Sequence, residues 1–265
     1  MLALELHETE AHAIPAREVR DLGDSLLLYD PRDRDPFWNR LARIRWPEDP
    51  AAFDRRLTEA IAAFLVLGRR PHVWPSPVHA SPPDLAARLQ ANGFRDIGGG
   101  HLMVLSEASG CGPVRPEELE AGVTIHAIRR VADARPSDPE DVADVLVDSF
   151  GALPTRVPEL AADLRQTLDD PRVALAIVRV DGTPAAVAKT TSFDGHTYLS
   201  SIGTRPAYRG RGLAGLATRH AVAAAGTLGT DTVYLGVSRG NAAALALYRR
   251  LGFTSIGQSP DLLLE

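Results

Sequence analysis

Cysteine is almost absent from this sequence of 265 residues. The single one, Cys111, excludes an internal disulfide and favours a reducing compartment, so we expect a cytoplasmic location. Cys111 lies in a stretch rich in glycine and proline, and we interpret it as an incidental thiol rather than a nucleophile.

Long apolar runs, a basic excess and metal-ligand spacings are also missing. The longest apolar run covers residues 60–67, which is much shorter than a membrane-spanning helix. A net charge of −5 argues against non-specific nucleic-acid binding, because such binding needs a basic surface. The eight histidines show neither an H-x-x-x-H nor an H-E-x-x-H spacing, and no G-x-S-x-G motif is present. We therefore expect a globular protein with no membrane, nucleic-acid or metal partner.

One stretch of the chain has the composition of a linker. Residues 106–122 are rich in glycine, serine, proline and glutamate and have no sustained apolar period. We therefore expect an N-terminal lobe over residues 1–105, a linker over 106–122 and a C-terminal domain over 123–265.

Within the C-terminal domain, the hydrophobic pattern predicts an alternation of strands and helices. Asp181-Gly182 and Asp194-Gly195 are typical of tight hairpin turns. Strands are expected at 123–128, 173–180, 185–193, 196–204, 233–237 and 255–264, and helices at 138–150, 160–168, 211–226 and 241–251.

The segment Arg209-Gly210-Arg211-Gly212-Leu213-Ala214 joins the strand at 196–204 to the next helix. Its two glycines remove the Cβ atoms that would keep a ligand away from the backbone. The unpaired N–H groups and the positive dipole end of the helix face this loop, which suits a pyrophosphate. Four arginines and no acidic residue lie between positions 205 and 219, and we place Arg209 and Arg211 near the phosphates.

A second motif lies near the end of the chain. Asn241 opens a helix that contains Tyr248 and ends at Gly252-Phe253. With the glycine loop, this motif resembles the Gcn5-related N-acetyltransferase (GNAT) family. The family pattern Arg/Gln-x-x-Gly-x-Gly/Ala is met by Arg209, Gly212 and Ala214, and the resemblance covers roughly residues 122–265.

The resemblance implies an α/β (α+β) fold in which a mixed central sheet is flanked by helices. It also implies transfer of an acetyl group from acetyl-CoA, the co-substrate, to a primary amine. Backbone groups at Ile202, Gly203 and Thr204 would pair with the pantetheine arm, and Asn241 would contact the same arm. Tyr248 would be the catalytic general acid for the leaving thiolate. The full expected cofactor-binding set is Ile202, Gly203, Thr204, Arg209, Gly210, Arg211, Gly212, Leu213, Ala214, Asn241 and Tyr248.

The N-terminal lobe contains an echo of the second motif. The segment from Leu89 through Gly93-Phe94 to Gly98 aligns with residues 248–257 at a constant separation of 159 positions. The same separation pairs an expected helix at 52–67 with the helix at 211–226, but the glycine loop, the asparagine and the tyrosine have no counterpart. We interpret residues 1–105 as a degenerate GNAT-like lobe.

The general base and the acceptor stay open at this stage. Many relatives carry a glutamate on the strand before the glycine loop, whereas residues 196–204 contain no carboxylate. His196, Ser200, Ser201 or a water molecule remain as candidates. The acceptor would be a small-molecule or peptide amine, and a homodimer is compatible with the sequence. The missing carboxylate leaves a second hypothesis, a non-catalytic acyl-CoA-binding or sensory protein.

Overall fold

The structure is a computed structural model of the chain that describes residues 2–79, 81–106, 111–226 and 231–265. Internal contacts divide the chain into two units. Unit 1 comprises Met1–Met103, Gly236–Ala242 and Ser255–Glu265, and unit 2 comprises Val104–Leu235 and Ala243–Thr254. This division differs from the expected one, in which each domain is continuous, because unit 1 takes up two short segments from the C-terminal part.

Unit 1 is built on a six-stranded sheet with the order β1-β2-β3-β4-β13-β5. Its buried core includes Trp46, Phe53, Phe64 and Leu89, which lie between the sheet and helices α2 and α3. The elements are α1 (Leu2–Ala13), β1 (Glu18–Asp21), β2 (Leu26–Tyr29), η1 (Pro36–Trp38), β3 (Arg40–Ala42), α2 (Pro50–Val66), β4 (His72–Val73), α3 (Leu85–Ala91), β5 (Arg95–Asp96) and β13 (Leu262–Leu263).

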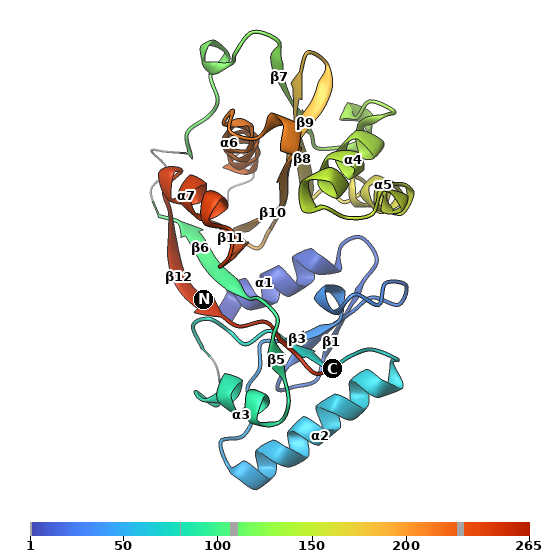
Figure 1. Cartoon of the computed structure of the whole chain (residues 1–265), viewed down its shortest axis with the longest axis vertical. Coiled ribbons are helices and arrows are strands. Elements are labelled where there is room, and N and C mark those ends of the chain that lie inside the picture. The colour runs from blue at the N-terminus through green and yellow to red at the C-terminus, as the bar shows by residue number, and fades with distance from the viewer. Residues whose placement is uncertain (1, 80, 107–110, 227–230) are drawn as a thin grey trace. The chain divides into compact units, whose positions relative to one another are not determined.

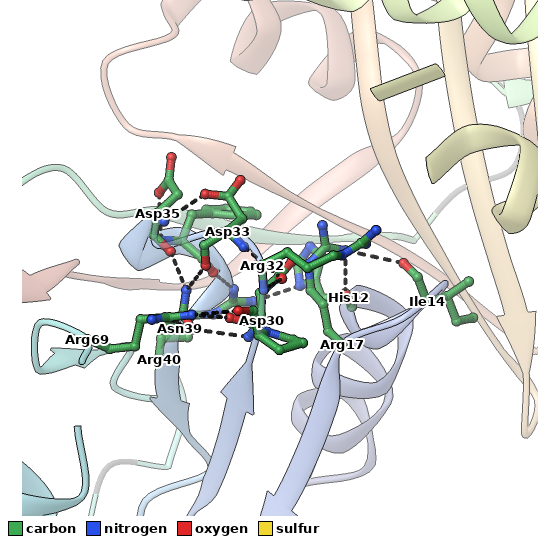
Figure 2. A network of polar contacts seen from close by, with 12 residues as sticks. His12, Ile14, Arg17, Asp30, Arg32, Asp33, Asp35, Asn39, Arg40 and Arg69 are labelled. Atoms are coloured by element: carbon green, nitrogen blue, oxygen red, sulfur yellow. Dashed lines mark hydrogen bonds and ion pairs between the residues drawn. The ribbon is translucent and has the colours of Figure 1, made fainter. Parts of the chain in front are cut away.

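A buried polar network fixes the connection between β2 and β3 (Figure 2). The Asp30 carboxylate accepts hydrogen bonds from the backbone N–H groups of Arg32 and Asp33 and lies 2.9 Å from Arg17 Nε. Asn39 accepts from Arg69 Nε at 3.1 Å. Because these charged groups find partners within the connection, their burial is compatible with a stable lobe.

The other two tryptophans of unit 1 each carry an arginine on one ring face. The guanidinium of Arg17 lies 3.7 Å from the Trp38 ring centre, and that of Arg40 lies 3.9 Å from the Trp74 ring centre. These stacked arginines cover the faces that an aromatic cage would offer to a cationic ligand.

Unit 2 contains most of a seven-stranded sheet with the order β12-β6-β11-β10-β9-β8-β7. Figure 1 shows α6 on one side of strands β8 to β10 and α4 with α5 on the other. The elements are η3 (Pro116–Glu118), β7 (Val123–Ile128), η4 (Val131–Asp133), α4 (Asp138–Phe150), η5 (Pro154–Arg156), α5 (Val157–Thr167), β8 (Val173–Val180), β9 (Thr183–Phe193), β10 (His196–Thr204), η6 (Pro206–Tyr208) and α6 (Leu213–Gly226).

Four elements run across the division between the units. They are β6 (Gly100–Leu105), β11 (Thr232–Ser238), α7 (Ala242–Arg250) and β12 (Phe253–Ser259). Since β10 pairs in parallel with β11 and antiparallel with β9, the predicted mixed sheet is confirmed.

Several predicted elements have the observed boundaries. The strands at 123–128, 173–180 and 196–204 and the helix at 138–150 match β7, β8, β10 and α4. Asp181 and Asp194 have φ values of 49° and 48°, as tight turns between twisted strands require.

The expected final strand at 255–264 is wrong in one respect. β12 ends at Ser259, and Pro260 interrupts the strand because it has no N–H to donate to a neighbouring strand. The following strand, β13, joins the sheet of unit 1, where it pairs antiparallel with both β4 and β5.

The expected linker is tied to α6 where the structure describes it; residues 107–110 lie outside the described residues. Arg219 donates to the backbone oxygens of Gly112 and Pro113 and pairs with Glu118 at 2.6 Å. Hydrogen bonds from Arg219 and Arg115 lower the pKa of Glu118 to about 2.

Candidate active site

The end of β10 offers a strand edge to a ligand. Its parallel pairing with β11 begins at His196–Thr232 and ends at Leu199–Leu235, although β10 continues to Thr204. Beyond Leu199, only the β9 side of β10 has a paired strand among the described residues. Ile202, Gly203 and Thr204 therefore lie on an edge whose backbone groups can pair with an extended ligand.

A local irregularity accompanies this edge. The pairing of β10 with β9 shifts between Ser200 and Gly203, and Ser201 has a φ of 51°. Gly203 lies close to α4, because a Cβ atom there would stand 2.9 Å from Ser149 Oγ. Glycine at this position lets the last turn of α4 approach the end of the strand.

The glycine loop leads directly into α6. Gly210 and Gly212 have φ values of 79° and 75°, and the space where a Cβ atom would stand is open at both. Within the described chain, the backbone N–H groups of residues 210–214 donate to no acceptor, and the first hydrogen bond of the helix runs from Leu216 N to Gly212 O. A row of free N–H groups at the positive end of a 14-residue helix suits a phosphate group.

The arginines around this loop have acidic or carbonyl partners from distant parts of the chain. Arg209 donates to Thr204 O at 3.3 Å and to Ser149 O at 2.8 Å. Arg211 pairs with Glu120 at 2.9 Å. The local absence of acidic residues therefore does not describe the charge at the site, which depends on tertiary contacts.

Two further arginines of the C-terminal part, Arg205 and Arg239, are also paired. Arg205 binds Asp144 and lies 3.4 Å from Asp148, and Arg239 lies 2.8 Å from Asp96 within unit 1. Both guanidinium groups are therefore held by carboxylates of the chain itself.

Tyr248 lies on α7 with its ring buried. The side chain is 6% exposed, and its ring centre is 6.0 Å from that of Phe253. Among the described residues the hydroxyl has no hydrogen-bond partner, and burial raises the pKa of Tyr248 to about 12. The phenol therefore stays protonated at neutral pH and is available as a donor.

Asn241 lies immediately before α7 and is exposed. Its backbone N–H donates to Ser238 O at 3.0 Å, which closes the turn between β11 and α7. The division of the chain assigns Asn241 to unit 1 and Tyr248 to unit 2.

Three unpartnered hydroxyls lie along β10 and at the end of α4. Ser200 Oγ, Thr204 Oγ1 and Ser149 Oγ are inaccessible to solvent and have no hydrogen-bond partner in the described chain. Asp194, by contrast, sits in an exposed turn. Ser200 was a candidate from the sequence, whereas Ser149 was not, because nothing in the local pattern of α4 reveals that Gly203 packs against it.

Other searches within the described residues add no catalytic group. No group of three or more potential metal ligands is present there. Cys111 is buried, and burial raises the pKa of its thiol to about 11, which keeps it protonated and unreactive. No described helix combines the length and the apolar character needed to cross a bilayer.

A comparison with models of protein families finds a match in the C-terminal region of the chain. Residues 140–253 match the model of the acetyltransferase (GNAT) family. No curated protein matches the chain.

Solved structures share the fold over nearly the whole chain. A GCN5-related N-acetyltransferase from Kribbella flavida superposes with a TM-score of 0.72 at 22% identity, covering 99% of this chain and 94% of that one. One from Sphaerobacter thermophilus gives 0.65 at 17% identity, with 97% and 84% covered. A tandem GNAT protein from the clavulanic acid biosynthesis pathway gives 0.62 at 15% identity, with 96% and 86% covered. The expected tandem arrangement of two GNAT-like folds is therefore confirmed.

Proposed function

Because residues 140–253 of this chain match the model of the acetyltransferase (GNAT) family, we propose that the protein is an acetyl-CoA-dependent N-acetyltransferase. It would move the acetyl group directly to a primary amine of a small molecule or peptide. The observation that carries this proposal is the free row of backbone N–H groups at residues 210–214, beside the open edge of β10.

The chain's own groups would suit two adjacent parts of acetyl-CoA, the pyrophosphate and the pantetheine arm. The N–H groups of residues 210–214 would hold the pyrophosphate, with Arg209 and Arg211 adding positive charge nearby. Ile202, Gly203 and Thr204 would pair through their backbone with the amide-bearing pantetheine arm, in the manner of an added strand. Asn241 remains a proposed contact to the same arm.

Transfer of the acetyl group from the thioester to an amine requires little more than correct positioning of the two reactants and a proton donor for the leaving sulfur. A neutral amine nitrogen bonds to the thioester carbonyl carbon, the C–S bond breaks, and the departing thiolate accepts a proton. Holding the two reactants in contact supplies roughly 7–11 kcal/mol of barrier lowering. The Tyr248 hydroxyl, which has no partner in the described chain, would donate the proton or a hydrogen bond to sulfur.

The proton that leaves the amine has no carboxylate base on β10. The unpartnered hydroxyl of Ser200 is the group on that strand that we propose to hold the water molecule that accepts this proton. An acceptor amine that is already neutral at working pH would need no strong base. The single cysteine, which is free and buried, supports the proposal of a cytoplasmic enzyme.

The missing carboxylate is also the observation that favours the second candidate, a non-catalytic acyl-CoA-binding or sensory protein. Both candidates use the same cofactor site, so binding does not separate them. Turnover does, because only the enzyme releases free thiol from acetyl-CoA when an amine is present.

Calorimetric titration with acetyl-CoA tests the proposed site. The parent protein should bind saturably, and Gly212→Glu should lose binding because a carboxylate would occupy the phosphate position. Gly68→Glu is the matched control, since Gly68 also has a positive φ, 64°, and open space around it. Retention of full affinity by Gly212→Glu would show that the pyrophosphate lies elsewhere. A separate assay of thiol release from acetyl-CoA, over a panel of amines, decides between the enzyme and the sensory protein.

A further inference from the structure

The two halves of the chain repeat one local structure at a spacing of 159 positions. Gly93 and Gly252 have φ values of 90° and 92°, and each donates through its N–H to the residue three positions earlier at 3.1 Å. The phenylalanines that follow, Phe94 and Phe253, are 3% and 1% exposed. The repeat suggested by the sequence is therefore also a repeat of conformation.

The same comparison locates the counterpart of the cofactor site in unit 1. There β3 pairs in parallel with β4 at Leu41–Val73, as β10 does with β11, and the chain then runs into helix α2 as β10 leads into α6. The counterpart of the open strand edge at residues 202–204 is thus residues 43–45, directly after β3. The counterpart of the phosphate loop is the start of α2.

In unit 1 this strand edge is occupied by the chain itself. Ser81 forms a parallel bridge with Arg45, and Trp46 N donates to Ser81 O at 3.1 Å. Arg45 Nη1 donates in addition to His79 O at 3.0 Å. The backbone N–H of Trp46 is therefore already paired, and Ser81 stands beside Arg45 where an extended ligand would lie.

The start of α2 is closed in a similar way. The Asp49 carboxylate accepts a hydrogen bond from Ala52 N at 2.8 Å, and Pro50 at the first helical position has no N–H to offer. A negative side chain at the helix start also repels a phosphate group. The open row of N–H groups seen at residues 210–214 has no equivalent here.

The segment that occupies the edge, residues 75–79 and 81–82, is anchored within unit 1. Ser76 Oγ donates to Glu5 and accepts from the N–H groups of Val78 and His79. A Cβ atom on Gly257 would stand 2.5 Å from Pro77 O, so the backbone of β12 lies directly against the segment. These contacts hold it in place without a ligand.

We infer that this segment permanently fills the cofactor groove of the N-terminal lobe, so that the chain holds one acyl-CoA site and not two. The inference rests on the proposed function for the identity of the ligand, but the filled groove is a property of the free protein. The N-terminal lobe then acts as a scaffold, while the C-terminal domain alone carries the acyl-CoA chemistry.

Hydrogen exchange of the free, full-length protein tests the filled groove without any ligand. The N–H groups of Trp46 and Ala52 should exchange on the order of 100-fold more slowly than in an unstructured chain, because both are hydrogen-bonded in a folded lobe. Exchange of Trp46 at the unprotected rate would overturn the inference.

Titration with acetyl-CoA tests the single site. We expect one equivalent per chain for the parent, none for Gly212→Glu, and one for Asp49→Asn, which keeps the cap and removes only its charge. Two equivalents for the parent, or binding by Gly212→Glu with new protection at residues 45–53, would overturn it. No binding by a folded parent whose Trp46 N–H is protected would refute the proposed cofactor and leave the filled groove standing.

Discussion

Arg209 donates through Nη2 to the backbone oxygen of Ser149 at 2.8 Å, which ties the first residue of the glycine loop to the last turn of α4. A second hydrogen bond, from Nε to Thr204 O, holds the same side chain against the end of β10. One guanidinium therefore fixes three segments of the proposed cofactor site relative to one another.

Arg209→Ala should weaken acetyl-CoA binding by about tenfold, because both the fixed loop geometry and a nearby positive charge are lost. Since the side chain is exposed, the loss of folding stability should stay near 1 kcal/mol. Calorimetric affinity and a denaturant titration measure the two effects. Arg55→Ala, an exposed arginine on α2, is the control, and equal affinity of the two variants would contradict a role for Arg209.

Tyr248→Phe should lower kcat by roughly a hundredfold while leaving the affinity for acetyl-CoA nearly unchanged. The substitution removes only a hydroxyl that makes no hydrogen bond in the described chain, so stability should change little. Steady-state kinetics with any accepted amine measures the effect. An unchanged kcat would exclude the hydroxyl as the proton donor.

The raised pKa of Tyr248 predicts a specific pH dependence. Burial favours the neutral phenol, so the folded protein holds this proton up to about pH 12, above the unfolded value. The associated stability is complete below pH 10 and is lost as the pH rises from 10 towards 12. The difference in tyrosinate absorbance between the parent and Tyr248→Phe should appear in this upper range, and a difference already complete at pH 10 would be inconsistent with burial of the phenol.

Asp261→Ala should destabilise unit 1 by about 2–4 kcal/mol. Asp261 accepts hydrogen bonds from Nε2 of His72, which is 1% exposed, and from Trp74 Nε1, and both nitrogens would lose their acceptor inside the lobe. Chemical denaturation followed by tryptophan fluorescence measures the loss. The control is Glu265→Ala, whose exposed ion pair with Arg95 should contribute less than about 1 kcal/mol.

The elements of unit 2 could be read from the sequence because their determinants are local. An almost continuous apolar run marks β8, and Asp-Gly pairs with positive φ mark the turns at the two ends of β9. The two glycines of the loop, Gly210 and Gly212, likewise predict a backbone that a ligand can approach, and the space beside both is open. The places of the Asp-Gly turns and of the glycine loop between strands and helices could therefore be predicted from the order of residues along the chain.

The parts that could not be predicted depend on contacts between distant segments. The acidic partners of Arg205 and Arg211 lie about 60 and 90 positions away, so the local charge pattern overstated the free positive charge. The pairing of β13 with β4 and β5 depends on which sheet offers it a place, and a two-residue strand carries no such information. Ser149 enters the site only because Gly203 lets α4 approach.

The placement of two short strands limits how this protein can be divided. β6, which closes the first half of the sequence, lies between β11 and β12, and β13, at the end of the second half, lies between β4 and β5. A cut after residue 106 would leave each fragment with a sheet that lacks an inner strand. Each half of the chain thus supplies one inner strand to the sheet of the other half, as the two subunits of a strand-swapped dimer do. If the halves are produced as separate fragments, each should fold well only when the other fragment is present to supply the missing strand.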